Sequence, residues 1–192
     1  MIWTKIKKPF RRFADEDSGS VAMEAILVWP LLLWAYGATF VYFDAFRAKN
    51  LAMKAAYTVS DTISREYNAV NSDYIDTMYD MVNILSNSQH NAKMRITMVK
   101  YRKSDNKYLV VWSKSRGTAF PELTTTTLQT LNPELPVLPD GEQVIMVETK
   151  ALFEPFLKVG LGVVEHKNEI FTRPRFVAHI CYEAGNTLTC GT

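Results

Sequence analysis

The sequence predicts an α+β fold with a long N-terminal helix, transmembrane and then amphipathic, a second short helix, and an antiparallel sheet of about four strands. Three observations lead to this expectation. An apolar segment of membrane length lies near the N-terminus, helical apolar spacing follows it, and the rest is dominated by β-branched and aromatic runs separated by turn residues. A chain of 192 residues has room for one domain and an anchor.

The apolar segment predicts a transmembrane helix over residues 20–43. Apart from tyrosines, Glu24 is the only ionisable residue between Val21 and Phe43. About 20 apolar residues, rising about 1.5 Å each, are enough to cross the hydrocarbon core. Residues 1–19 carry an excess of positive charge, which places this leader in the cytoplasm and residues 44–192 across the membrane. The basic residues of the leader are Lys5, Lys7, Lys8, Arg11 and Arg12.

A cleaved secretory signal peptide is the alternative interpretation of the same segment. Such a peptide has an apolar core of about 7 to 15 residues and a small-x-small cleavage site. The segment here is longer, and it ends in the bulky sequence FVYFDAF, residues 40–46. These features favour a helix that stays in the membrane.

Beyond Asp44 the helix is expected to continue as an amphipathic rod. Apolar residues recur there at three- and four-residue spacing, with charged residues between them. A break near Asp44, followed by a separate surface helix, is the alternative. The apolar positions are Ala48, Leu51, Ala52, Ala55, Ala56, Val59, Ile63, Tyr67 and Val70.

A second helix and a hairpin are predicted next along the chain. Residues 71–86 have helical apolar spacing, with Asn71 or Ser72 as the N-cap. Residues 93–102 and 107–115 are rich in β-branched and aromatic residues and flank SDN at 104–106, which predicts an antiparallel hairpin.

The middle of the chain is predicted to be a surface excursion. TTTT at 124–127 and prolines at 133, 136 and 139 precede a turn at Asp140 and Gly141. Two further strands are expected over residues 143–153 and 169–183. Pro174 interrupts the second of them, which favours an edge position or a bulge.

The chain shows no set of residues typical of a catalytic or metal site. His90, His166 and His179 lack a ligand spacing such as H-x-x-x-H. The GLG sequence at 160–162 lacks the third glycine of a phosphate-binding loop and is interpreted as a turn. The net charge of +2 is spread along the chain, which does not indicate a nucleic-acid partner. We therefore expect no metal, no cofactor and no enzymatic activity.

The two cysteines, Cys181 and Cys190, are predicted to form a disulfide. They lie on the expected far side of the membrane, which in a bacterium is an oxidising compartment. Gly185 and Asn186 between them favour a turn that brings them together. The alternative is two free thiols in a reducing compartment.

The N-terminal sequence RRFADEDSGSVAMEAILVWPLLL, residues 11–33, resembles the TadE/TadF-like minor pilins, or pseudopilins, of tight-adherence pili. Members of this branch of the type IV pilus superfamily have a basic leader ending in glycine, an apolar helix, and a glutamate fifth after the glycine. Gly19 and Glu24 have this spacing, Pro30 also fits, and TRPRF at 172–176 resembles a segment near the end of TadE-like chains. Many pilins of this branch carry an aromatic residue after the glutamate, where this chain has Ala25.

The resemblance implies a processing site and a role for Glu24. A prepilin peptidase in the inner membrane would cut between Gly19 and Ser20 and leave the helix in place. The Glu24 carboxylate would then lie near the new Ser20 amine and could pair with the amine of a neighbouring subunit. The implied partners are other minor pilins, the pilus assembly platform and the peptidase.

Two other functions are weighed against the minor pilin. The first is a single-pass anchored periplasmic scaffold that is never processed. The second is a membrane-tethered enzyme, which the missing catalytic set argues against.

Overall fold

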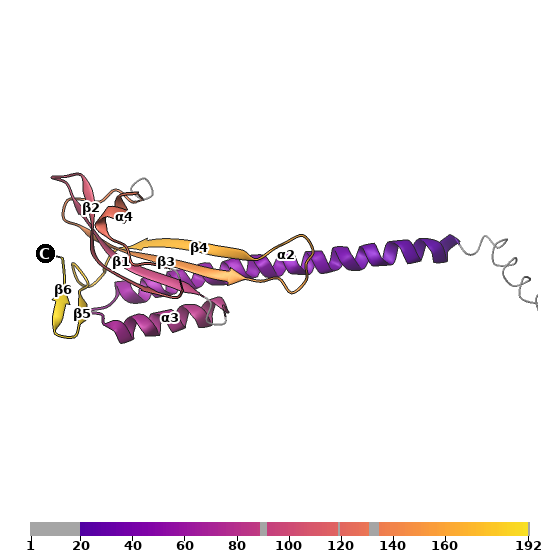
Figure 1. Cartoon of the computed structure of the whole chain (residues 1–192), viewed down its shortest axis with the longest axis horizontal. Coiled ribbons are helices and arrows are strands. Elements are labelled where there is room, and N and C mark those ends of the chain that lie inside the picture. Colours follow the sequence, from indigo (N-terminus) through magenta and orange to yellow (C-terminus); the bar gives the residue numbers. More distant parts are fainter. Residues whose placement is uncertain (1–19, 89–91, 119, 131–134, 192) are drawn as a thin grey trace, which may run out of the picture. The chain divides into compact units, whose positions relative to one another are not determined.

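The computed structural model describes residues 20–88, 92–118, 120–130 and 135–191, and it confirms the α+β class (Figure 1). The described chain forms two compact units. One comprises residues 20–44 together with 155–161, and the other comprises residues 45–154 and 162–191. The elements in chain order are α2 (Ser20–Ser64), α3 (Ser72–Ser86), β1 (Lys93–Arg102), β2 (Lys107–Arg116), α4 (Thr125–Thr130), β3 (Gln143–Phe153), β4 (Val164–Thr172), β5 (Tyr182–Ala184) and β6 (Thr187–Thr189).

Helix α2 is a single helix of 45 residues, so the alternative of a break near Asp44 is wrong. It contains Pro30, which has no N–H to donate; membrane helices tolerate such a residue where other groups satisfy the freed carbonyl. The Thr39 hydroxyl donates to the carbonyl of Ala35 at 2.9 Å. A polar side chain in an apolar segment is thereby satisfied within its own helix.

The predicted amphipathic stripe of α2 is buried in the second unit. The small side chains of Ala52, Ala55 and Ala56 are at most 2 % exposed, and Val59 and Ile63 are fully buried. The helix ends at Ser64, so the expected continuation to Val70 is wrong. Val70 forms a strand-like bridge with the segment around Tyr182, because its N–H donates to Cys181 O and its carbonyl accepts from Glu183 N, both at 2.9 Å.

Helix α3 has the boundaries that its sequence predicts. The Asn71 side chain accepts from the Tyr74 N–H at 2.9 Å, which confirms Asn71 as the N-cap. Asn87 ends the helix in the left-handed conformation at φ 54°. The buried face of α3 includes Ile75, Met78 and Val82.

The four-stranded sheet has the order β2-β1-β3-β4, and each neighbouring pair is antiparallel. The predicted hairpin forms β1 and β2, with a register shift at Met98/Val99. One face of the sheet packs with α3 and the C-terminal part of α2 (Figure 1). The strand residues of this core are Met94, Ile96, Met98, Trp112, Ile145 and Val147.

The described part of the segment that was predicted to be a surface excursion packs on the other face of the sheet. The prediction that it lies only on the surface is therefore wrong. Residues 125–130 form the short helix α4, and Thr124 and Thr127 exchange side chain to backbone hydrogen bonds at its start. Leu128 is fully buried. The core here comprises Val99, Tyr108, Leu123, Leu128, Leu135, Leu138, Val144 and Met146. The predicted turn is confirmed, with Gly141 at φ 77° and its N–H donating to Tyr101 O at 2.9 Å.

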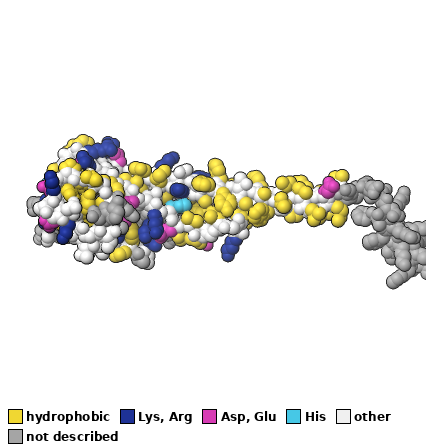
Figure 2. Space-filling model, turned by 90° about the horizontal axis from the view of Figure 1, so that it is seen from above, with side chains coloured by type: hydrophobic (Ala, Val, Ile, Leu, Met, Phe, Trp, Pro, Cys, Tyr) yellow, Lys and Arg dark blue, Asp and Glu magenta, His cyan; other side chains and the backbone are white. Residues whose placement is uncertain are grey.

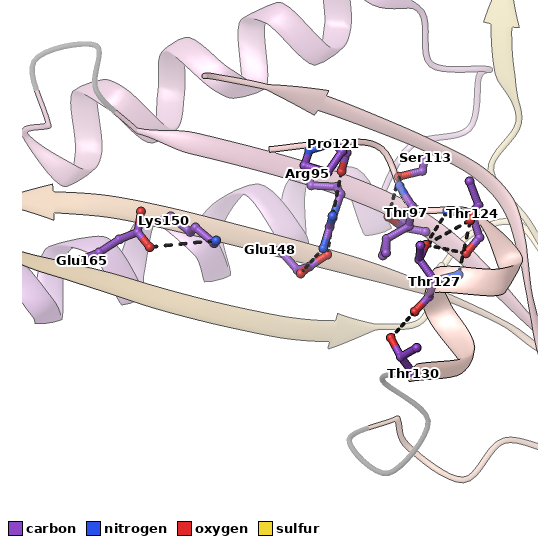
Figure 3. Close-up of polar contacts among 11 residues, drawn as sticks. Arg95, Thr97, Ser113, Pro121, Thr124, Thr127, Thr130, Glu148, Lys150 and Glu165 are labelled. Carbon is purple, nitrogen blue, oxygen red and sulfur yellow. Dashed lines mark hydrogen bonds and ion pairs between the residues drawn. The ribbon is translucent and has the colours of Figure 1, made fainter. Parts of the chain in front are cut away.

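A buried ion pair crosses this second face (Figure 3). Arg95 on β1 donates from Nε and Nη2 to the two carboxylate oxygens of Glu148 on β3, each at 2.6 Å. Its Nη1 donates to Pro121 O at 2.7 Å, and its guanidinium lies 4.3 Å from the centre of the Phe120 ring. The guanidinium thus joins β3 to the segment around Phe120 and Pro121.

The predicted bounds of the last strand, residues 169–183, are wrong. β4 covers Val164–Thr172 and stops before Pro174, which has no N–H for a ladder. β4 does lie at the edge of the sheet, as the proline predicts. Residues 173–181 are not a strand, so His179 does not share a strand face with Val177 and Cys181. The chain resumes as a small β5–β6 hairpin, and a Cys181–Cys190 disulfide closes it, as predicted.

Removing one partner of the Arg95–Glu148 pair is expected to cost about 3 kcal/mol of unfolding free energy, because the other charge stays buried and unpaired. The side chains are only 9 % and 14 % exposed. Arg95→Met should therefore be strongly destabilised in urea unfolding, whereas Arg95→Met/Glu148→Met should recover much of the loss. The exposed Arg102–Asp105 pair is the control, and Arg102→Met should cost less than about 1 kcal/mol. Additive effects of Arg95→Met and Glu148→Met would contradict the coupling.

The Cys181–Cys190 bond is expected to stabilise the fold by about 2.5 kcal/mol, the loop-closure entropy of a short loop. The two cysteines are 9 residues apart in sequence. Cys181→Ser/Cys190→Ser should lower the unfolding free energy by this amount without altering the far-ultraviolet spectrum. Reduction of the native chain should reproduce the loss, and an unchanged urea midpoint after full reduction would refute the prediction.

Candidate functional site

The N-terminal part of α2 is an exposed apolar surface. Hydrophobic side chains cover it in the space-filling view (Figure 2). Only 6 % of its most apolar 18-residue window is buried, which differs from the mostly buried core helix of a soluble protein. The length and composition suggest a membrane anchor, and a signal sequence meets the same two criteria. Its exposed large side chains are Val21, Met23, Ile26, Leu27, Val28, Trp29, Leu31, Leu32, Leu33, Trp34, Tyr36, Phe40, Tyr42, Phe43 and Phe46.

Glu24 lies on this apolar surface near the start of the described helix. Its side chain is exposed, and no acidic residue is present in the first turn of α2, which begins at Ser20. Residues four apart are neighbours on one helix face, so Ser20 and Glu24 share a face. A helix dipole stabilises carboxylates mainly within the first turn, and Glu24 lies just beyond it. Gly19 and the leader 1–19 lie outside the described residues.

The TRPRF segment, residues 172–176, binds the C-terminal end of α2. The Arg175 N–H donates to Ser64 O at 2.8 Å and so satisfies a carbonyl that the helix itself leaves free. The Arg175 guanidinium lies 2.9 Å from the Asp61 carboxylate, which also pairs with Arg65. This segment therefore caps the helix at its backbone and through its charge.

Three further contacts extend this attachment. The hydroxyls of Thr172 and Ser60 lie 2.5 Å apart. Arg173 pairs with Glu142 at 2.8 Å, and the Phe176 ring stacks on Tyr67 with centroids 4.9 Å apart. We define the TRPRF clamp as residues 172–176 with these contacts. It holds the end of α2 to the edge strand β4 and to the turn before β3.

The two described histidines, His166 and His179, are not arranged as a metal site. The side chains of His179, Cys181 and Cys190 lie within 4.8 Å of one another, but both sulfurs belong to the disulfide and offer no thiolate. His166 lies on β4 beside the Phe153 ring, where burial, and next the charge of Lys49, lower its pKa. His90 lies outside the described residues.

An open groove of about 400 Å³ runs beside β2. Among its lining residues, the Ser113 hydroxyl is engaged with Thr97 and with the Leu123 N–H, and Lys114 pairs with Glu122. The lining residues include no histidine or cysteine to act as base or nucleophile. The groove does not supply a catalytic pair, and the absence of enzymatic activity stays a prediction.

Charged side chains lie beside the Arg95 pair on the second face of the sheet (Figure 3). Glu165 on β4 lies 3.1 Å from Lys93 and 3.9 Å from Lys150. The hydrogen bond from Lys93, and next the charges of Lys93, Lys150 and Lys167, hold the pKa of Glu165 below its usual value. These groups are paired with one another, which is typical of a surface ion-pair network.

One feature near α2 was missed by the sequence analysis. The loop between β3 and β4, residues 155–161, forms a compact unit with residues 20–44. Its sequence PFLKVGL is unusually apolar for a loop, which was the available signal. The chain bends at Gly160, the first residue of the GLG sequence, where φ is 97°.

Comparison with known proteins adds no relative: no family model, no curated protein and no solved structure matches this chain.

Proposed function

We propose that this protein is a minor pilin, or pseudopilin, of a tight-adherence pilus in the bacterial inner membrane. It acts as a non-enzymatic assembly subunit whose leader is removed by a prepilin peptidase after Gly19. One observation carries the proposal. Glu24 stands exposed, one turn after Ser20, in a stretch of α2 that has no other charged residue up to Phe43, and the same helix continues to Ser64.

Glu24 places a carboxylate near the start of an apolar helix. A charged side chain in the hydrocarbon region costs several kcal/mol unless it is paired or reaches the interface. Cleavage before Ser20 creates an amine one helical turn from Glu24, within reach on the same face. In an assembly the same amine can pair with Glu24 of a neighbouring subunit and fix the register between the two helices.

The exposed apolar surface of α2 supports assembly as well as anchoring. Most large aromatic and aliphatic side chains of the helix from Val21 to Phe46 are exposed, whereas Val41 is buried. Such a surface is stable in lipid, and outside lipid it must be covered by similar helices. A bundle of these helices is the expected core of a filament.

The charge of the leader and the disulfide support the orientation. The basic residues before Gly19 favour a cytoplasmic N-terminus, which places the folded domain in the periplasm. A disulfide between Cys181 and Cys190 suits that oxidising compartment. The second candidate, an unprocessed anchored scaffold, requires the same helix but gives Glu24 no partner amine.

Processing is expected to yield a chain that begins at Ser20. The measurement is the intact mass and N-terminal sequence of the protein recovered from membranes of its own host. Gly19→Val, which adds a branched side chain at the cleavage position, should leave the chain beginning at Met1. A native chain that begins at Met1 in cells with an active prepilin peptidase would refute processing and favour the scaffold.

Glu24→Ala is expected to spare membrane insertion and impair pilus assembly, because it removes the partner of the Ser20 amine. Membrane fractions report insertion, and counts of pili per cell report assembly. Met23→Ala is the matched control, since it truncates an exposed neighbour without altering charge, and it should assemble normally. Unchanged pilus number and composition with Glu24→Ala would show that the pairing role is wrong.

A further inference from the structure

We propose that the β3–β4 loop, residues 155–161, is a second membrane contact that inserts apolar side chains at the lipid interface beside α2. The proposal rests on the membrane-anchoring part of the proposed function. Residues 155–161 take no part in the proposed cleavage after Gly19 or in the proposed pairing of Glu24. The proposal assigns the lipid bilayer, and no other protein, as the occupant of this apolar surface.

The loop exposes large apolar side chains that a water-facing loop would not need. Phe156 is 63 % exposed and Leu157 is 43 % exposed. Lys158 follows them directly. A bulky aromatic and an aliphatic residue beside one lysine are typical of interfacial segments, since the apolar groups enter the acyl boundary and the ammonium extends to the phosphates.

The loop contacts the anchor helix within one compact unit. The rings of Phe156 and Phe40 meet edge to face, with centroids 5.6 Å apart at 83°. Leu157 lies over Gly37, where a Cβ atom would be 3.5 Å from Leu157 Cδ1. This is an ordinary van der Waals separation, so the loop lies directly over this position of α2.

The length of α2 sets the depth of this contact. Phe40 is 20 residues beyond Ser20, a rise of about 30 Å at about 1.5 Å per residue, which equals the thickness of the hydrocarbon core. With Ser20 at one boundary, Phe40 and its partner Phe156 lie at the other. The aromatic residues Tyr36 and Tyr42, both exposed, flank this level, as expected for an interfacial belt.

The irregular backbone of the loop sets a limit on its depth. Lipid-exposed loops do not occur inside the hydrocarbon region, because their N–H and C=O groups have no partners there. The loop therefore lies at the interface, where its backbone meets water and headgroups while Phe156 and Leu157 point into the acyl boundary. The membrane contact adds to the single span without forming a second one.

The test is the depth of a nitroxide at Leu157→Cys in the full chain, reconstituted as one copy per nanodisc of phosphatidylcholine and phosphatidylglycerol. Both native cysteines form the disulfide, so the label attaches at the new thiol. Collision rates with oxygen and with a neutral nickel chelate report depth, because oxygen concentrates in lipid and the chelate in water. Leu32→Cys is the standard for a deep position, because it lies in the middle of the apolar part of α2. Ser104→Cys is the standard for a water-exposed position, because it lies in an exposed turn.

We expect the oxygen-to-nickel collision ratio at Leu157 to be several-fold above that at Ser104 and below that at Leu32. A label at Phe156→Cys, with Leu157 intact, should also give a ratio between those at Ser104 and Leu32. This second site shows whether the result depends on the substitution at Leu157. An aqueous ratio at both loop sites with a deep Leu32 label would overturn the inference and leave the anchor intact. Reduced collisions with both reagents at the loop would show that the label is buried against α2 instead of facing lipid, and would also overturn the inference. An aqueous Leu32 label would refute membrane anchoring itself.

Discussion

The packing of the last turns of α2 against the sheet is the interaction on which the rest of the fold depends. Val59 and Ile63 belong to the main core, and the small residues Ala52, Ala55 and Ala56 are buried beside them. The TRPRF clamp then satisfies the helix end at Ser64 O and pairs with Asp61. The same helix also carries the exposed apolar segment in its N-terminal part.

The sheet is covered on both faces, and this explains its mixture of apolar and charged positions. β1 contributes Met94, Ile96 and Met98 to the helix side and Val99 to the side covered by residues 120–130 and 135–138. Arg95 lies between them on that second side, where Glu148, Pro121 and the Phe120 ring satisfy its guanidinium. A buried charge is tolerated here because each of the three guanidinium nitrogens donates to a partner, and it links the segment around Pro121 to the sheet.

Local rules predicted the elements whose signals lie within a few residues. The Asn71 cap, the β1–β2 hairpin and the strand at 143–153 follow from capping, turn chemistry and β propensity. Two failures have long-range causes. The backbone of Val70 pairs with the segment around Tyr182, and Leu128 of α4 is buried in the core on the second face of the sheet. No local pattern encodes those partners. The end of β4 before Pro174 has a local cause, because proline has no N–H for a ladder.

For the candidate site, the sequence by itself determined the apolar helix, the position of Glu24 after Gly19 and the cysteine pair, because each depends on composition or on spacing along one element. Tertiary structure decided three other matters: that the apolar helix stays exposed instead of entering the core, that residues 172–176 clamp α2, and that Phe156 packs on Phe40. The clamp and the Phe156–Phe40 contact join residues more than a hundred positions apart, and the exposure of the apolar helix depends on what the rest of the chain buries. Such contacts depend on the shapes of two surfaces that are distant in sequence. The sequence pattern shows only whether each surface is apolar or charged.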